Sequence, residues 1–345
     1  MFQRILVPLD GSSRAERAIP VAARIARATH GSVLLLRVAA FPAQYGLYLY
    51  QAYPSSSPVL AEEMLDTELE QAQYYLTALA HSEPLAGITV EMRACTGVAA
   101  PAILALAREQ HADLIVMCSH GRTGFKRWAL GSVAQKIVRQ SPLPVLLLRE
   151  GSPAPADLQS SAAHPLRALV ALDGSPFAEA ALIPAAHLIA ALASPGKGAL
   201  HLAQIVSLPE MMSEQGYAED EAVREQVLHA ATIYMNRVAE HLRTRLAAEL
   251  ALQVTWSVSL KEDLADALTR TAELGEETGS FEGEGCDLMA MATHGLSGFQ
   301  RWMIGSITQR VLDGTTLPLL IVRPQELDTA ITRELTEEEA LHVLP

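Results

Sequence analysis

Cysteine is scarce in this sequence of 345 residues, which contains only Cys95, Cys118 and Cys286. The three residues are widely spaced and form no C-x-x-C pair, the spacing found in many zinc sites and redox motifs. Because the number is odd and the residues are isolated, we expect reduced thiols within a hydrophobic core rather than a disulfide framework or a zinc site.

Long apolar runs are also absent. The longest, such as Pro144–Leu148, end far short of the ~20 residues that a membrane-spanning helix needs. The first residues, Met1–Pro8, lead directly into a strand pattern and lack the layout of a signal peptide. We therefore expect a cytoplasmic protein that has no membrane partner.

Positive charge is in short supply. The 26 Lys and Arg residues are outnumbered by 39 Asp and Glu residues, which gives a net charge of −13. A field of this sign repels nucleic acid and anionic lipid, so nucleic acid is not an expected partner. Any anionic ligand should be small and held locally by backbone N–H groups and a few basic side chains.

Several signatures of nucleotide chemistry are missing. The sequence has no G-x-x-x-x-G-K-[ST] element, which excludes a P-loop kinase or ATPase, and no G-x-G-x-x-G fingerprint after its first strands. It also has neither the H-x-G-H turn nor the S-G-G-x-D-S loop expected of nucleotidyl-transferring or hydrolysing α/β enzymes. We give that enzyme class little weight.

The sequence does contain one phrase written twice. In the first copy, Ser119–Gly121 (Ser-His-Gly) is followed by nine residues and then Gly131–Ser132. In the second copy, Thr293–Gly295 (Thr-His-Gly) is followed by nine residues and then Gly305–Ser306. Each copy follows an apolar run and precedes a helix-like run, the setting in which α/β proteins hold phosphate groups.

The repeat extends over most of the chain and indicates a duplicated domain. In the sequence, His120 and His294 are separated by eleven more residues than the matching strand ends Asp10 and Asp173. The second copy therefore contains insertions. We place these mainly in Ser194–Gly198 and Gly275–Gly285. The predicted organisation is a first domain at 1–150, a linker rich in Pro, Ala and Ser at 151–165, a second domain at 166–324, and an acidic tail at 325–345.

Strand-like and helix-like segments alternate within each copy. Apolar runs such as Ile5–Val7 and Leu34–Leu36 are continuous, which is typical of strands covered by helices on both faces. In the first copy we predict strands at Arg4–Leu9, Ser32–Val38, Thr89–Ala94, Leu114–Cys118 and Val145–Arg149, and helices at Ser13–His30, Val59–His81, Ala99–His111 and Val133–Gln140. The predicted fold class is α/β, with two tandem Rossmann-like domains, each a five-stranded parallel sheet with helices on both faces.

The repeated phrase predicts a phosphate-binding turn at the carboxyl ends of the strands. Gly121 and Gly131 allow the backbone to approach a ligand closely, and the free N–H groups of a helix start favour an anion. Ser132–Gln135 and Ser306–Gln309 each match the S-x-x-Q pattern of a capping box. Glycines beside a helix start can also simply form a turn, and this alternative stays open.

The polar residues near this turn have two interpretations. Asp10 and Asp173 can accept hydrogen bonds from a base or a ribose, but each can equally form an Asx turn or cap the following helix. His120 and His294 can likewise be loop residues that take no part in chemistry. The residues alone leave both interpretations open.

Together these motifs resemble the universal stress protein family, and the chain looks like a tandem of two such domains. The resemblance rests on a strand ending in P-x-D, a later strand ending in M-x-[ST]-H-G, nine residues, G-S, a helix and a P-V-L-L-L-R-type strand. It implies adenine nucleotide alpha hydrolase-like domains with an ATP-binding pattern, G-x-x-G-x9-G-[ST]. That pattern places the adenine near Asp10 and Val38, and the ribose and phosphates along Met117, Gly121, Gly131 and Ser132.

The resemblance assigns nucleotide binding to matching positions in both domains. In the first domain they are Pro8, Leu9, Asp10, Val38, Met117, Cys118, His120, Gly121, Arg122, Gly131, Ser132 and Val133. In the second domain they are Ala171, Leu172, Asp173, Ile205, Met291, Ala292, His294, Gly295, Gly305, Ser306 and Ile307. The first glycine of the family pattern is replaced by Cys118 in one copy and by Ala292 in the other, and the larger cysteine leaves less room for a ligand.

The implied function is that of an ATP-binding or other adenine-nucleotide-binding stress-response protein, a sensor or regulator with at most slow hydrolysis. We find no clear general base, acidic metal cluster or arginine finger, so we assign no catalytic and no metal-ligating residue. Mg²⁺ or Mn²⁺ would arrive with the nucleotide. The alternative is a nucleotide-free tandem scaffold that binds a partner protein.

The family resemblance also implies a pairing of the two domains. The last strands, Val145–Arg149 and Leu319–Arg323, would pair edge to edge within one chain as an intrachain pseudo-dimer, which would cover two exposed sheet edges. Whether chains associate further as a homo-oligomer stays open.

Overall fold

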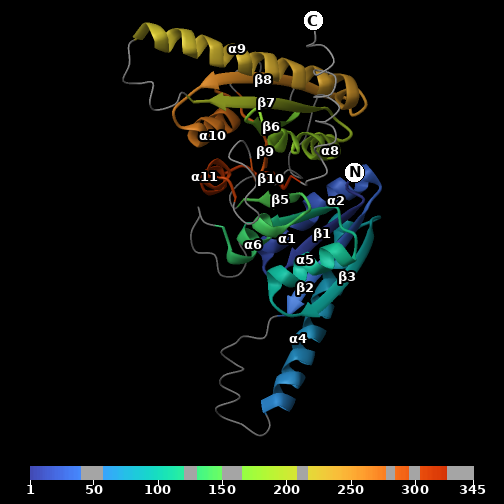
Figure 1. Cartoon of the computed structure of the whole chain (residues 1–345). Helices are drawn as coiled ribbons and strands as arrows, with labels where there is room; N and C mark the ends of the chain where they lie inside the picture. Colours follow the sequence, from blue (N-terminus) through green and yellow to red (C-terminus); the bar gives the residue numbers. More distant parts are fainter. Residues whose placement is uncertain are drawn as a thin grey trace, which may run out of the picture. The chain divides into compact units, whose positions relative to one another are not determined.

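The computed structural model of the chain describes residues 1–39, 57–119, 130–149, 165–207, 217–276, 284–294 and 304–324, and for 57–61 and 217–220 it describes the backbone alone. The chain divides into two compact units, Met1–Ala156 and Asp157–Pro345. Each unit is an α/β domain with helices packed on a parallel sheet (Figure 1), which confirms the predicted fold class. Most of the predicted linker and all of the acidic tail lie outside the described residues.

Unit 1 contains five parallel strands in the order β3-β2-β1-β4-β5. The strands are β1 (Arg4–Leu9), β2 (Ser32–Ala39), β3 (Thr89–Thr96), β4 (Leu114–Cys118) and β5 (Val145–Leu148). The helices are α1 (Ser13–Glu16), α2 (Ala18–Thr29), α4 (Ser57–Ala80), the 3₁₀ turn η1 (Glu83–Leu85), α5 (Ala99–Glu109) and α6 (Ser132–Gln140).

Unit 2 repeats this topology, with strands in the order β8-β7-β6-β9-β10. The strands are β6 (Leu166–Leu172), β7 (Gly198–Val206), β8 (Leu252–Leu260), β9 (Leu288–Ala292) and β10 (Leu319–Val322). The helices are α7 (Pro176–Glu179), α8 (Leu182–Ala193), α9 (Tyr217–Leu242), the π-helical turn η3 (Arg243–Ala247), α10 (Leu264–Leu274) and α11 (Ser306–Gly314).

The central strands are apolar because helices cover both of their faces. Leu34, Leu35 and Leu36 of β2 are consecutive and fully or almost fully buried. In unit 1, α4 packs on β2 and β3, while α5 packs against α6 and on β2; in unit 2, α9 packs on β7 and β8 (Figure 1). Continuous apolar strands are the expected outcome of burial on two sides.

The strand predictions for unit 1 are accurate at their amino-terminal ends. All five strands begin at the predicted residue, and their last residues differ from prediction by two positions at most.

The predicted single helix Ser13–His30 is wrong, because α1 ends at Glu16 and α2 begins at Ala18. At Arg17 the N–H donates to the carbonyl of Arg14, a tight turn that separates the two helices.

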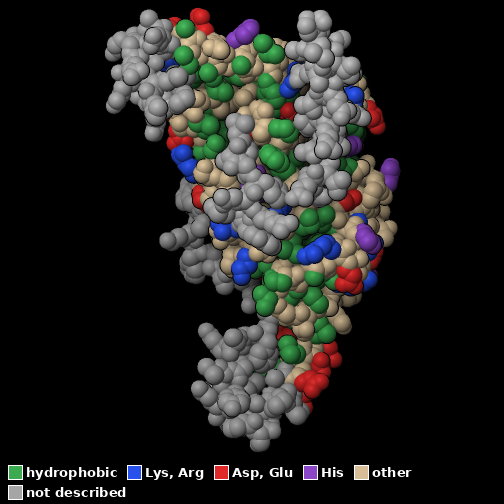
Figure 2. All heavy atoms as spheres, viewed as in Figure 1, with side chains coloured by type: hydrophobic (Ala, Val, Ile, Leu, Met, Phe, Trp, Pro, Cys, Tyr) green, Lys and Arg blue, Asp and Glu red, His purple; other side chains and the backbone are tan. Residues whose placement is uncertain are grey.

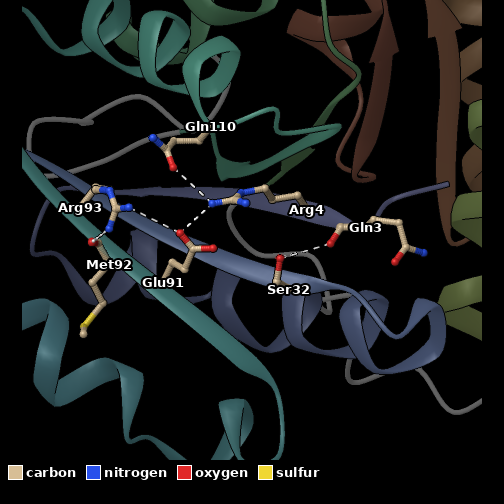
Figure 3. A network of polar contacts seen from close by, with 7 residues as sticks. All are labelled: Gln3, Arg4, Ser32, Glu91, Met92, Arg93 and Gln110. Atoms are coloured by element: carbon tan, nitrogen blue, oxygen red, sulfur yellow. Dashed lines mark hydrogen bonds and ion pairs between the residues drawn. The ribbon is translucent and has the colours of Figure 1, made fainter.

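A polar network lies at the opposite end of unit 1 from the strand termini that hold the predicted site. Arg4 donates through Nη2 to Glu91 Oε2 at 2.6 Å and to Gln110 Oε1 at 3.2 Å, and Arg93 lies 3.6 Å from the same Glu91 oxygen (Figure 3). The network joins β1, β3 and the end of α5. Because these side chains are partly exposed, we attribute to it alignment of the elements rather than a large contribution to stability.

The surface of unit 1 reflects the negative net charge. Acidic side chains gather along α4 (Figure 2), where Glu62, Glu63 and Asp66 are exposed.

Within the described residues, one stretch, Pro176–Ala193, is long and apolar enough to cross a membrane, with a mean hydropathy of 1.5. However, 61% of this stretch is buried, as in a helix that packs in a protein core.

A buried histidine lies in the core of unit 2. His201 of β7 has no exposed surface, and its ring nitrogens lie 2.9 Å from Thr255 Oγ1 and 2.8 Å from Ser257 Oγ, both on β8. Burial lowers the pKa of His201 to about 4. The folded protein therefore holds this imidazole neutral at every pH above that value.

This histidine should make the protein less stable in acid. In the unfolded chain it becomes protonated below its ordinary pKa of about 6.5, so its stabilising effect is complete above that pH and is lost as pH falls towards 4, up to ~3 kcal/mol. Urea unfolding at a series of pH values should show a shallower pH dependence for His201→Gln than for the wild type. The exposed His229→Gln should behave like the wild type, and equal pH dependence in all three proteins would contradict the prediction.

Candidate functional site

The carboxyl ends of the central strands meet at one edge of each sheet. In unit 1, β1 pairs with β2 on one side and β4 on the other, which brings Asp10 and Val38 to the same edge. In unit 2, β6 lies between β7 and β9 and brings Asp173 and Ile205 together in the same way. Open parallel sheets bind their ligands at this edge.

The aspartate after the first strand builds a turn in both units. Oδ1 of Asp10 accepts hydrogen bonds from the Ser12 N–H at 3.0 Å and the Ser12 hydroxyl at 2.6 Å, and Ser12 Oγ accepts from the Ala15 N–H to cap α1. Asp173 and Ser175 repeat these bonds at 2.9 and 2.6 Å. Of the two interpretations that the sequence left open, the Asx turn is confirmed. Contact with a base or ribose stays a prediction.

A glycine completes each turn. Gly11 has φ +86° and Gly174 has φ +88°, in the left-handed region that side chains with a Cβ rarely adopt. A Cβ on Gly11 would lie 3.3 Å from Arg37 Nη1, and a Cβ on Gly174 would lie 3.4 Å from Gln204 Nε2. Arg37 of β2 in unit 1 and Gln204 of β7 in unit 2 therefore each lie directly against the turn.

In unit 1 this side chain belongs to a cluster of charged and aromatic groups. The guanidinium of Arg37 lies 4.8 Å from the centre of the Tyr75 ring, and the Tyr75 hydroxyl donates to Glu16 Oε1 at 2.8 Å. Burial and the neighbouring Glu16 raise the pKa of Tyr75, so its hydroxyl stays a donor. The cluster joins β2, the long helix α4 and the short helix α1 beside the Asp10 turn.

Unit 2 keeps the tyrosine and glutamate but not the cation on the strand. Tyr234 of α9 donates to Glu179 Oε1 at 3.0 Å, and burial together with Glu179 raises the pKa of Tyr234. The cation near the ring is Arg237 of the same helix, 5.8 Å from the ring centre. The position that matches Arg37 holds the neutral Gln204, which is 6% exposed.

The strands that precede the repeated phrase end differently in the two units. The thiol of Cys118 donates to the carbonyl of Arg14 in α1 at 2.8 Å. In unit 2 the matching Ala292 is buried, and its carbonyl accepts from Thr308 Oγ1 at 3.0 Å. The Cys118 side chain is thus turned towards α1.

The helix after the repeated phrase begins at a glycine in both units. Gly131 caps α6 and Gly305 caps α11, and neither capping residue contributes a side-chain bond. The predicted capping boxes are therefore wrong, because Ser132 and Ser306 are the first helical residues and not the caps. Gly131 N–H donates to the Ser119 carbonyl at 2.8 Å, and Gly305 makes the matching bond at 2.8 Å, so the glycine is pinned to the end of the strand.

The remaining predicted residues lie in strands, in the first turns of two helices or outside the described residues. Pro8, Leu9, Ala171 and Leu172 lie in the first strands, Met117 and Met291 are buried in β4 and β9, and Val133 and Ile307 are the second residues of α6 and α11. His294 is buried, with Nδ1 2.9 Å from Thr293 Oγ1. His120, Gly121, Arg122 and Gly295 lie outside the described residues.

Sequence reasoning missed the side chains that lie beside the Asp turn. They come from the short and long helices and from the second strand of each unit. Glu16 and Glu179 each lie four residues after the capping serine, so an alignment of the two copies contains a signal for them. The tyrosines lie on long helices far along the chain. No spacing rule links them to the turn, and only the packing of α4 and α9 shows the pairing.

Comparison with known proteins decides the family. The model of the universal stress protein family matches the chain twice, at residues 1–149 and 166–323. The chain belongs to the universal stress protein family. Each of its two domains carries one copy of the family sequence, which confirms the resemblance drawn from the repeated motifs.

Curated relatives of this universal stress protein match one domain at a time. A universal stress protein of Thermus aquaticus is 37% identical over 152 residues, which is 43% of this chain and 100% of the relative. A universal stress protein of Methanocaldococcus jannaschii is 29% identical over 156 residues, 44% of this chain and 84% of the relative.

Solved structures match the whole tandem chain. A functionally unknown protein from Pseudomonas aeruginosa is 17% identical with a TM-score of 0.55, and the match covers 98% of each chain. A universal stress protein from Archaeoglobus fulgidus is 19% identical with a TM-score of 0.54, covering 94% of this chain and 99% of the other. At these identities the likeness shows the fold alone.

The tyrosine-glutamate contact of each universal stress domain should contribute to its stability. Tyr75→Phe removes the donor to Glu16, and we expect a loss of ~1 kcal/mol in the free energy of unfolding, because the pair is only half-buried. Denaturant unfolding measures this loss. Tyr74→Phe is the matched control, since Tyr74 is the neighbouring residue and is 80% exposed. Equal stability of the two variants would contradict the structural role of Tyr75.

Proposed function

We propose that this universal stress protein binds an adenine nucleotide such as ATP at the strand-end edge of each domain and acts as a sensor or regulator. Mg²⁺ or Mn²⁺ would enter with the phosphates. Within the described residues no group of three or more His, Cys, Asp or Glu converges as a metal site of the protein's own.

The observation that carries this proposal is the uncapped helix start at the edge of each sheet. The first N–H groups of a helix have no partner within the helix, and a side-chain cap normally satisfies one of them. The capping residues Gly131 and Gly305 supply no side-chain bond of this kind, and the helix dipole adds positive potential at the same place. An anion such as a nucleotide phosphate would be a fitting partner for these N–H groups.

The surroundings of the helix start support the same ligand. Ser132 and Ser306 are exposed at the helix starts, and the thiol of Cys118 donates a hydrogen bond to the carbonyl of Arg14. Asp10 lies at the neighbouring strand end, where a base or ribose can reach it. These groups bind and orient a nucleotide, and we assign no catalytic residue, so hydrolysis would be slow at most.

Blocking the helix start should weaken nucleotide binding. In Gly305→Val the new methyl groups would crowd the first turn of α11, since a Cβ there already lies 3.3 Å from the Thr293 carbonyl oxygen. We expect at least about ten-fold weaker binding of ATP to unit 2 in titration calorimetry with Mg²⁺. Gly314→Ala at the other end of α11 is the control, because nothing lies within 4 Å of its Cβ position.

The alternative is a tandem scaffold that binds a partner protein and no nucleotide. Titration of the wild type separates the two functions, because a scaffold would give no heat with ATP and Mg²⁺ at high protein concentration. Mass spectrometry of protein purified without added ligand provides a second measurement. Absence of adenine nucleotide in both experiments would overturn the proposed function and favour the scaffold.

A further inference from the structure

Gln204 carries a buried amide oxygen that none of the described residues satisfies. The residue is 6% exposed, and its Oε1 has no hydrogen-bond partner in the part of the chain that the structure describes. Buried side-chain oxygens in folded proteins almost always have a partner, so this exception requires an explanation. A ligand that supplies a hydrogen-bond donor is one.

The place of Gln204 connects this oxygen to the proposed nucleotide site. Gln204 pairs in register with Leu172, the last residue of β6, and Asp173 follows directly. Its Nε2 lies 3.4 Å from the Cβ position of Gly174, so the amide rests on the Asp173 turn. The next residue along β7 is Ile205, which is buried at the same edge.

The amide can present either of its polar atoms to this turn. The last torsion of a glutamine side chain has a broad, roughly two-fold preference, so a half-turn exchanges the oxygen and the nitrogen. One orientation places the acceptor against the turn and the other places the donor there. Gln204 can therefore present either an acceptor or a donor to a ligand at the turn.

Unit 1 offers different chemistry at the matching position. Arg37 pairs in register with Leu9 as Gln204 does with Leu172, and its guanidinium lies against Gly11 and over the Tyr75 ring. A guanidinium has only donors and cannot accept a hydrogen bond. At this position, therefore, Gln204 of unit 2 can accept a hydrogen bond from a ligand and Arg37 of unit 1 cannot.

We infer that Gln204 determines base specificity in unit 2, where its amide oxygen accepts a hydrogen bond from the 6-amino group of an adenine nucleotide. This inference rests on the proposed function and assigns the base end of that site. Gln and adenine have matching donor and acceptor pairs, whereas a 6-oxopurine presents an acceptor where adenine presents the amine. Unit 1, with Arg37, lacks this preference for the amine.

The variant Gln204→Leu tests the inference because it removes both polar atoms and keeps a side chain of similar size. ATP and inosine triphosphate, which has a 6-oxo group, are each titrated with Mg²⁺ into the full chain, and thermal unfolding is measured without nucleotide. The wild type should contain a site that binds ATP about ten-fold more tightly than inosine triphosphate. Gln204→Leu should abolish this difference by weakening ATP alone.

Thermal unfolding distinguishes base recognition from a structural role. If Gln204 serves the ligand, the leucine variant without nucleotide should unfold at the same temperature as the wild type or at a higher one, because an unsatisfied buried oxygen has been removed. Arg37→Leu is the matched control at the same register of unit 1 and should leave the preference for ATP intact.

Two results would overturn the inference while the proposed function stands. One is ATP binding whose preference over inosine triphosphate is unchanged in Gln204→Leu. The other is an equal loss of both nucleotides together with a lower unfolding temperature, which would make Gln204 a packing residue. If the wild type binds neither nucleotide, the proposed function and the inference fail together.

Discussion

Each domain depends on one turn, in which a single carboxylate oxygen accepts two hydrogen bonds from the serine two residues further along the chain. Asp10 and Asp173 make this turn directly after a strand that is buried by its neighbours. The turn holds a glycine in the left-handed region and starts the following helix with a serine cap. It therefore sets where the next helix, the second strand and the long helix meet.

The two domains show how much can change around this constant feature. Both keep a tyrosine that donates from the long helix to a glutamate of the first short helix. They differ in the group that lies on the glycine, a half-buried cation in one domain and a buried neutral amide in the other. An unsatisfied buried amide oxygen costs about 1–3 kcal/mol, which is a sizeable share of the net stability of a domain. Such a cost is easier to understand where a ligand offsets it.

Much of this architecture could be predicted from the sequence because it follows from local patterns. Continuous apolar runs predicted where the strands begin, and the spacing of the repeated phrase predicted two domains of one family. The helix after the repeated phrase was also predicted, but its cap was not. Serine is the commoner capping residue, whereas here the preceding glycine caps the helix because its N–H is bonded to the end of the strand.

The groups that border the turn were not predictable because they depend on tertiary packing. Tyr75 lies 59 residues after Glu16, with α2, β2 and much of α4 between them, and no periodicity links the two. Arg37 and Gln204 each lie within a strand, where an isolated polar residue carries no signal of its role. Their importance follows only from the contact with Gly11 and Gly174.

The bond between Gly131 and Ser119 has a consequence for how such a domain can diversify. Together with its counterpart between Gly305 and Thr293, it joins the two ends of the intervening segment at the sheet. When a segment is closed at its base, doubling its length costs only about 0.6 kcal/mol, and the strand and helix keep their positions. Substitutions and insertions in that segment therefore leave the flanking strand and helix in place at little cost to the fold. A tandem protein can change the segment in one domain and keep it in the other.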